Sequence, residues 1–224
     1  KEITYHERQI LINRLCEKYE KSVNKFTMLY KTKNIITVED PVKMRIDGIN
    51  QVQVNSDIGL DFATVLRSIL RQDPNVIMIG EIRDSETAQI AVRASITGHL
   101  VLSTLHTNNS LTTIERLIDM DVERYLLASA LSGIVSQKLA RKLCDKCKRL
   151  RETTPYEKQL FKKYLGIDIE QIHEAVGCPE CSGGYKGRIA LQEVLLISPN
   201  IRDAISAKIS KAELRDLVYG DDVI

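Results

Sequence analysis

Acidic and imidazole side chains follow three apolar runs of the sequence, each at the point where the run ends. Glu39 and Asp40 follow the first run. Glu81 follows the second after a single glycine, and His106 follows the third. A carboxylate at the end of an apolar strand commonly holds a magnesium ion and its water beside phosphates, and a second carboxylate can accept a proton from an attacking water. The plainer interpretation stays open, because acidic residues often end strands simply by leaving the core.

The cysteines form two close pairs, Cys144 with Cys147 and Cys178 with Cys181, whereas Cys16 stands alone in an apolar helical pattern. In a reducing compartment, paired Cys-x-x-Cys spacings indicate a metal site rather than disulfides. Four thiolates complete a tetrahedral zinc site and leave no position for water, so such a site is structural. The alternatives are four reduced thiols without metal, and a zinc ribbon that grips nucleic acid, for which the sequence offers no further support. Cys16 is expected to pack in a core.

The elements that must position these residues are indicated by hydrophobic periodicity and by turn residues. Short apolar or alternating runs predict strands over 34–38, 51–54, 76–79, 100–105 and 187–196. Apolar positions at helical spacing predict two short helices at the end of the chain and longer ones over 5–23, 62–70, 84–97, 111–119 and 122–142. Asp84 is the expected N-cap of its helix, and Gly98 is its expected stop.

Strands that alternate with helices predict an α/β fold with a mostly parallel, doubly wound sheet. In such a sheet the ligand crevice lies at the carboxyl ends of the strands, so Glu39, Glu81 and His106 should converge on one edge. The expected order of domains is a helical segment from an N-terminal domain, the sheet-bearing core, a zinc-binding subdomain and a C-terminal return to the core with helices, at 1–24, 25–143, 144–187 and 188–224.

Composition excludes some classes of protein. Hydrophobic residues make up 43% of the chain and charged residues 28%, which is ordinary for a soluble globular protein. No apolar run approaches the roughly 18–20 residues that cross a bilayer. The charged opening of the chain is unlike a signal peptide, so we expect a cytoplasmic location. The absence of Trp and the presence of only three Phe argue against stacking platforms for nucleic acid.

Three longer segments resemble the motor ATPases of bacterial type II secretion and type IV pilus assembly. Ile36–Val42 resembles their Asp box, Leu66–Asp84 their Walker B region, and Thr97–Asn108 their His box. The two cysteine pairs resemble the tetracysteine zinc element of the secretion and assembly members, and Gly187–Leu195 resembles the segment that follows it. The resemblance implies a RecA-like, mostly parallel sheet with helices on both faces and a small zinc-binding insertion.

Carried over by position, the resemblance implies a role for each candidate residue. Glu39 would be the catalytic base, and Glu81 the Walker B carboxylate that positions magnesium and water. His106 would sense the γ-phosphate of ATP or the subunit interface, with His99 in support. Asp40 belongs to the same nucleotide or interface group. The further candidates for interface or phosphate contacts, which could equally be solvent-exposed helix arginines, are Arg67, Arg71 and Arg83.

The resemblance also implies an assembly. It implies a homo-hexameric ring that hydrolyses ATP with magnesium, carries structural zinc and docks on an inner-membrane platform protein of the pilus or secretion machine. The ring would then be peripheral to the plasma membrane at its cytoplasmic face and would move pilin or pseudopilin subunits, or serve DNA uptake. Direct binding of nucleic acid is not expected.

The sequence departs from the family in the loop that should hold phosphates. The pattern Gly-x-x-x-x-Gly-Lys-Ser/Thr occurs nowhere, and the first glycine is Gly48. Without glycines the backbone cannot wrap its N–H groups around phosphates. Either the chain is a non-hydrolysing ring or scaffold subunit, or stretches are missing from the sequence, and we favour the second. Breaks are expected near Asn24–Lys25 and Tyr30–Thr32, because Tyr30 lies too close to the next strand for a helix to finish and turn.

Overall fold

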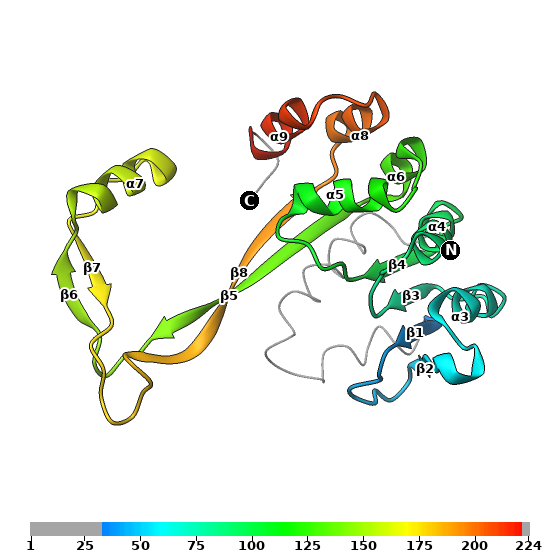
Figure 1. Ribbon diagram of the computed structural model, residues 1–224, viewed down its shortest axis with the longest axis horizontal. Coiled ribbons are helices and arrows are strands. Elements are labelled where there is room, and N and C mark those ends of the chain that lie inside the picture. The colour runs from blue at the N-terminus through cyan, green and yellow to red at the C-terminus, as the bar shows by residue number, and fades with distance from the viewer. Residues whose placement is uncertain (1–32, 221–224) are drawn as a thin grey trace. The chain divides into compact units, whose positions relative to one another are not determined.

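The computed structural model describes residues 33–220 and contains a four-stranded sheet (Figure 1). In the order of their pairing the strands are β2 (Asn50–Gln53), β1 (Ile35–Glu39), β3 (Val76–Ile79) and β4 (Leu100–Ser103). Every neighbouring pair is parallel, and Val38 lies opposite Ile79 in the central pair. The carboxyl ends of all four strands therefore lie at one edge, and the expected α/β fold with a parallel sheet is confirmed. The helix expected over 5–23, Cys16 and both expected breaks lie outside the described residues.

The strands form where β-branched residues can be buried on both faces of the sheet. Val38 of β1 and both Ile77 and Ile79 of β3 have no exposed side-chain surface. Such continuous apolar runs are typical of parallel strands that helices cover. The core thus fixes the two central strands, and the polar residues that follow them are forced to the sheet edge.

Side chains with short polar groups begin the helices that connect the strands. Each of three caps accepts a hydrogen bond from the backbone N–H of the third helical residue, which satisfies one of the unpaired donors of a helix start. The capped helices are α3 (Phe62–Ile69, cap Asp61), α4 (Ser85–Ile96, cap Asp84) and α5 (Ser110–Asp119, cap Asn109). The expected cap at Asp84 is confirmed, and Gly98 follows the end of α4 with a φ of +102°.

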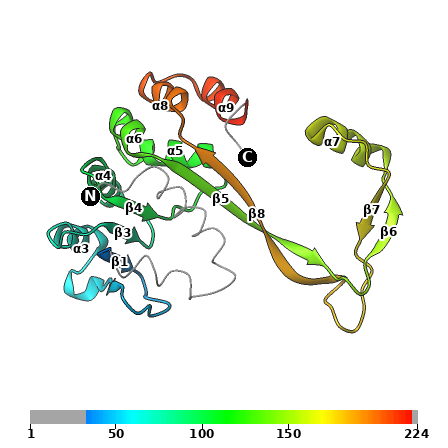
Figure 2. The same cartoon turned by 180° about the vertical axis from the view of Figure 1, so that it is seen from behind.

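The helix expected over 122–142 is wrong beyond Ala130. α6 spans Arg124–Ala130, and Gly133–Leu143 form strand β5. Gly133 would lie in the interior of the expected helix, where a glycine costs roughly 0.5–1 kcal/mol relative to alanine. β5 also pairs with β8 (Tyr185–Leu196), and both views show these two strands side by side (Figures 1 and 2). A partner so far along the chain leaves no trace in the local periodicity, so the local pattern predicts the wrong element.

Contacts divide the chain into two compact units. The larger contains the described residues up to Ser136 and from Val194 onward, and the smaller is Gln137–Glu193. The smaller unit is wider than the insertion expected over 144–187, because it includes adjoining parts of β5 and β8.

Two short helices close the larger unit, as the sequence predicts. They are α8 (Pro199–Ser206) and α9 (Lys211–Gly220). Arg202 of α8 donates from Nη1 to the backbone carbonyl of Ala128 at 2.6 Å, which fastens α8 to the end of α6. Among the described helices, none is long and apolar enough to cross a bilayer.

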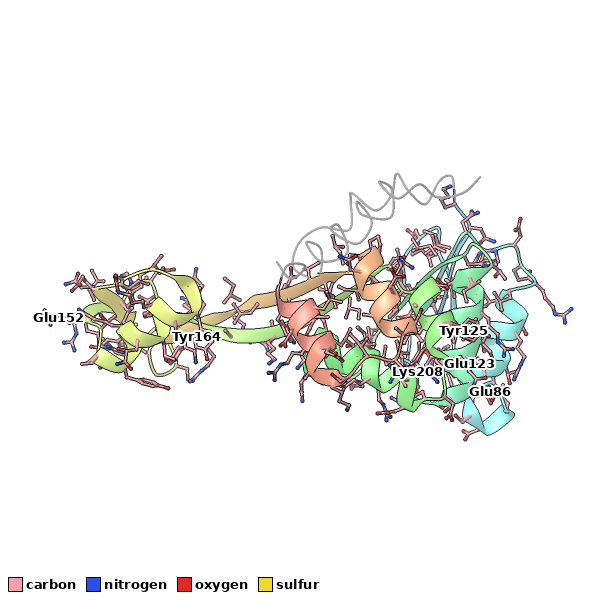
Figure 3. The ribbon with its side chains drawn as sticks, turned by 90° about the horizontal axis from the view of Figure 1, so that it is seen from above. Glu86, Glu123, Tyr125, Glu152, Tyr164 and Lys208 are labelled. Carbon is pink, nitrogen blue, oxygen red and sulfur yellow. The ribbon has the colours of Figure 1, made fainter. Side chains whose placement is uncertain are left out.

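The smaller unit has little apolar core of its own. It contains an antiparallel pair, β6 (Arg149–Glu152) with β7 (Gln171–Glu174), and the helix α7 (Pro155–Leu165). No residue of α7 is buried, and the side chain of Tyr164 is 70% exposed (Figure 3). Apolar packing therefore contributes little to this helix, and polar contacts at its start become important.

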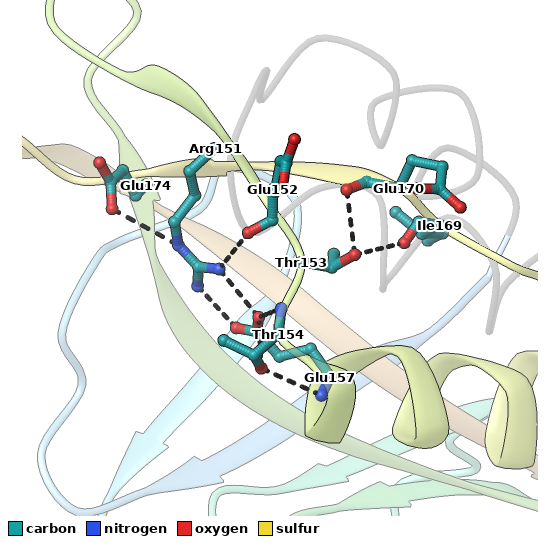
Figure 4. A network of polar contacts seen from close by, with 8 residues as sticks. All are labelled: Arg151, Glu152, Thr153, Thr154, Glu157, Ile169, Glu170 and Glu174. Atoms are coloured by element: carbon teal, nitrogen blue, oxygen red, sulfur yellow. Dashed lines mark hydrogen bonds and ion pairs between the residues drawn. The ribbon is translucent and has the colours of Figure 1, made fainter.

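A network of polar contacts joins the start of α7 to both strands of the pair (Figure 4). Arg151 donates from both terminal nitrogens to Glu157, at 2.6 and 2.8 Å, and its Nε lies 3.4 Å from Glu174 Oε2. The hydrogen bond from Arg151 is the main cause that lowers the pKa of Glu157 to about 2. Thr154 and Glu157 cap each other in a capping box. Glu157 thus stays ionised near neutral pH and links the helix start to β6.

We expect Thr154→Ala to loosen α7 selectively. The variant loses the cap hydrogen bond, which in most helices costs about 1 kcal/mol, and no buried side chain of α7 compensates. Amide hydrogen exchange over 155–165 should become roughly five times faster, as a loss of about 1 kcal/mol implies. The matched control is Ser198→Ala, which removes the cap of α8 and should leave the amides of α7 unchanged. Equal protection of α7 in Thr154→Ala and the parent would contradict this expectation.

Candidate functional site

Three candidate site residues lie at the carboxyl edge of the sheet. Glu39 ends β1, Glu81 follows β3 after Gly80, and His106 lies beyond the end of β4. The backbone N–H of Gly80 donates to the carbonyl of Val38 at 2.7 Å. A Cβ at position 80 would lie 3.2 Å from that carbonyl oxygen and 3.4 Å from the Cα of Glu39. A side chain there would press on β1, so glycine allows Glu81 to emerge beside the end of that strand.

Glu81 contacts an arginine and a histidine at this edge. Arg83 Nη2 donates to Glu81 Oε1 at 2.5 Å, and His106 Nε2 lies 3.1 Å from Oε2. Arg83 Nη1 also lies 3.9 Å from Asp40 Oδ2, which adds Asp40 to the cluster. The hydrogen bond from Arg83 is the largest cause that lowers the pKa of Glu81 below its ordinary value. A lowered carboxyl pKa favours the charged form, so Glu81 offers the ionised oxygens that Mg²⁺ prefers.

Glu39 has a separate set of partners. Thr37 Oγ1 donates to Glu39 Oε1 at 2.6 Å, and Gln51 Nε2 donates to the same oxygen at 3.0 Å. The strand end therefore carries a carboxylate that two hydrogen bonds hold by one oxygen. A carboxylate held in this way can accept a proton from a water on its other oxygen.

The remaining candidates lie elsewhere. His99 precedes β4, and its Nδ1 lies 3.0 Å from the carbonyl of Ala94. His99 therefore lies at the amino end of β4, whereas His106 lies beyond its carboxyl end, and the structure does not bring these histidines together. Arg67 of α3 forms an ion pair with Glu86 of α4, and both side chains are more than half exposed. Arg71 is exposed just beyond the end of α3.

Three residues near this edge were not predicted from the sequence. Thr37 and Gln51 hold Glu39, and Thr104 Oγ1 donates to the carbonyl of Gly80 at 2.6 Å. The alternation of Gln51 with apolar neighbours predicted only a half-exposed strand. The register of β1 and β2 is needed to show that Gln51 lies beside the carboxylate of Glu39.

The sulfur atoms of the four paired cysteines lie close together in the smaller unit. The Sγ–Sγ distances are 4.0 Å for Cys144 with Cys178, 3.7 Å for Cys147 with Cys181, and 3.6 Å for Cys178 with Cys181. Ligands about 2.3 Å from a tetrahedral zinc ion lie about 3.8 Å apart, whereas disulfide sulfurs are about 2.05 Å apart. The donor set and its spacing therefore fit zinc.

Turns and the β5–β8 pair bring these cysteines together. Cys144 directly follows β5, and Cys178 and Cys181 precede β8. Within each pair the second residue donates its N–H to the carbonyl of the first, at 3.3 Å for Cys147 and 3.2 Å for Cys181. The N–H of Cys144 donates to the carbonyl of Gly184 at 2.8 Å, which ties the two arms of the chain. Strand pairing thus presents both pairs to a common centre.

Comparison with known proteins gives close relatives. Putative type II secretion system protein E of Escherichia coli (strain K12) is 50% identical over 187 residues, which cover 83% of this chain and 38% of the relative. The type IV pilus assembly ATPase PilB of Thermus thermophilus is 46% identical over 205 residues, which cover 88% of this chain and 23% of that protein. The chain thus spans less than half the length of these relatives.

Solved structures share the fold. A crystal structure of the pilus retraction motor PilT with bound ADP matches with a TM-score of 0.57 and 30% identity, over 89% of this chain and 52% of that one. The Legionella pneumophila ATPase DotB matches with a TM-score of 0.57 and 24% identity, over 85% of this chain and 45% of that one. The expected RecA-like α/β fold is confirmed by these neighbours. The family described as "Type II/IV secretion system protein" matches residues 22–222, and the chain belongs to that family.

Proposed function

We propose that this chain is the catalytic part of a motor ATPase that couples ATP hydrolysis to type IV pilus assembly or type II secretion. The protein acts as a homo-hexamer at the cytoplasmic face of the plasma membrane, where it docks on an inner-membrane platform protein and moves pilin or pseudopilin subunits. DNA uptake is a further use of the same motor. The names of the relatives, a type II secretion protein and a pilus assembly ATPase, support this class of function.

The observation that carries the proposal is the shared sheet edge of two carboxylates with different partners. Glu81 is paired with Arg83 and His106, whereas Glu39 is held by neutral donors. In the proposed reaction a water loses a proton to Glu39 as its oxygen bonds to the γ-phosphorus, and the bond from that phosphorus to the leaving ADP oxygen breaks. The side chain of His106, which is 89% exposed and lies 3.1 Å from Glu81 Oε2, would turn from Glu81 toward the γ-phosphate or a neighbouring subunit.

Two metals complete the proposal, and this chain's residues fit each. Glu81, which is ionised, would hold magnesium or its water, and the metal would neutralise charge on the phosphates. The cysteines would hold one zinc ion as a structural site, because four thiolates leave no coordination position for water. Zinc therefore takes no part in hydrolysis. Arg83 and Asp40 are proposed to contact the nucleotide or the adjacent subunit.

The gene sequence around residues 24–34 tests the motor directly. A nucleotide motor needs a glycine loop to hold phosphates, and the chain as printed contains none. We expect the gene to encode additional residues near 24–25 and 30–32, with the pattern Gly-x-x-x-x-Gly-Lys-Ser/Thr among them. Sequencing this region and measuring the intact mass of the expressed protein decide the matter. An uninterrupted coding sequence without that pattern would contradict the motor.

That outcome would favour the second candidate, a non-hydrolysing ring or scaffold subunit. The specific observation behind it is the same missing pattern, since the first glycine of the chain is Gly48. A scaffold would keep the folded core and the cysteine site but would not retain ATP. Equilibrium binding of a fluorescent ATP analogue to the intact gene product separates the two candidates, because only the motor binds it.

A further inference from the structure

We propose that Gln51 is a positioning residue for Glu39 and that it couples the carboxylate to the loop that follows β1. The inference rests on the proposed role of Glu39 as the base. It arises from three side chains that the sheet register brings together. Thr37 and Glu39 lie in the Ile36–Val42 segment, whereas Gln51 lies outside every segment that resembles the family. Gln51 is expected to act through Glu39, without touching the nucleotide.

Register explains why these side chains meet. Thr37 of β1 lies directly opposite Gln51 of β2 in the parallel pairing. Side chains alternate between the faces of a strand, so Thr37 and Glu39, two residues apart, lie on the same face. The hydroxyl of Thr37, which is only 3% exposed, and the amide of Gln51 both donate to Oε1 of Glu39. A one-residue shift of β2 would remove Gln51 from this group.

Both donors bond to the same oxygen of Glu39. Oε1 accepts both hydrogen bonds, at 2.6 and 3.0 Å, and Oε2 accepts none from the residues that the structure describes. Fixing one oxygen limits rotation of the carboxylate and leaves the other available for a water. A base held in one orientation avoids the loss of rate that small misplacements cause.

The same amide also holds the loop after β1. Gln51 Nε2 donates to the carbonyl of Met44 at 3.1 Å, and Gln51 Oε1 accepts from the N–H of Ile46 at 2.8 Å. One side chain therefore fixes both Glu39 and the loop. Movement of the loop would change the orientation of Gln51 and, through it, that of Glu39.

The strand also offers a matched control. Gln53 lies two residues beyond Gln51 and opposite Glu39 in the register, yet its side chain contacts the loop, where Oε1 accepts from the N–H of Val42 at 3.2 Å. Gln53→Glu therefore adds a carboxylate on the same strand, opposite Glu39, without removing a hydrogen bond to Glu39, and so controls for the added charge. Gln51→Glu keeps the acceptor for the N–H of Ile46 but loses the donor to Glu39 and to the carbonyl of Met44, and it adds a like charge.

The test is steady-state ATP hydrolysis by the intact gene product. Gln51→Glu and Thr37→Val each remove one hydrogen bond to Glu39, and each should lower kcat by about 10- to 100-fold with the KM for ATP little changed. Gln53→Glu should keep kcat within about twofold of the parent, a change too small to reflect a misplaced base. Circular dichroism and thermal melts check that all variants fold.

A second measurement does not depend on activity. In ¹⁵N-labelled protein, Glu39→Gln should shift the side-chain amide resonances of Gln51 and leave those of Gln53 in place. Equal losses of kcat in Gln51→Glu and Gln53→Glu, or a rise in KM with kcat unchanged, would overturn the positioning role. ATP turnover that persists in Glu39→Gln would instead show that Glu39 is not the base. The proposed function and the positioning role therefore fail by different results.

Discussion

Glu39→Gln is expected to reduce ATP turnover by about 10²- to 10⁴-fold, the usual contribution of a general base, while ATP binding stays largely intact. The substitution keeps the size of the side chain and removes its ability to accept a proton from water. Binding survives because the phosphates are held by other groups, foremost the glycine loop that we expect upstream. Single-turnover hydrolysis in the intact gene product measures the loss, and equilibrium binding of a fluorescent ATP analogue measures retention.

The matched control for this experiment is Glu86→Gln. Glu86 is an exposed carboxylate in the first turn of α4, where it pairs with Arg67 rather than with Glu39, Glu81 or His106. Its substitution changes charge by the same amount and should leave turnover close to that of the parent. If Glu39→Gln hydrolyses ATP as well as Glu86→Gln does, Glu39 is not the base.

The second large effect concerns the cysteines: purified protein should contain one zinc ion per chain, and Cys147→Ser should lose it. Zinc binding to such sites is worth roughly 10–16 kcal/mol at neutral pH, and the smaller unit has few buried side chains to replace it. Amide exchange over 144–187 should rise strongly in the variant, and docking on partners should weaken. The sheet edge with Glu39 and Glu81 should keep its shape. Metal analysis and hydrogen exchange provide both readouts.

Glu180→Gln serves as the control for the zinc experiment. Glu180 lies beside Cys181 and pairs with Lys146 at 2.6 Å, but it contributes no sulfur. Its substitution removes an exposed ion pair, which typically contributes little, and should leave the zinc content at one per chain. A zinc content far below one in the parent, under reducing conditions and without chelator, would leave the cysteine cluster without this explanation.

The sequence predicts best the elements whose causes are local. The buried runs that form β1 and β3, and the cap of α4 at Asp84, depend on neighbours within a few residues. The ribbon of β5 and β8 depends instead on pairing between distant segments. The run over 187–196 predicted strand β8, but the apolar periodicity of 122–142 predicted a helix in place of β5. Periodicity reports which face is apolar, but it does not report which partner covers that face.

The candidate site divides in the same way. The sheet edge that carries Glu39, Glu81 and His106 follows from strand order, because parallel strands end together. The side chains that hold Glu39 could not be inferred, since Thr37 and Gln51 meet only through the register of β1 and β2. Conversely, His99 is near His106 in the sequence but lies at the other end of β4. Two residues that are close in the sequence can thus lie at opposite ends of one strand.

The hydrogen bond from Cys144 to Gly184 has a consequence for how genes of this kind can change. It holds the departing and returning chain 2.8 Å apart, from donor nitrogen to acceptor oxygen, at the junction with the segment that carries β6, α7 and β7. A single deletion between these two points would leave ends that a tight turn could join, with β5 and β8 still paired. One insertion in a shorter ancestor would achieve the reverse. This segment can therefore be gained, lost or exchanged in one genetic event without changing the pairing of β5 with β8.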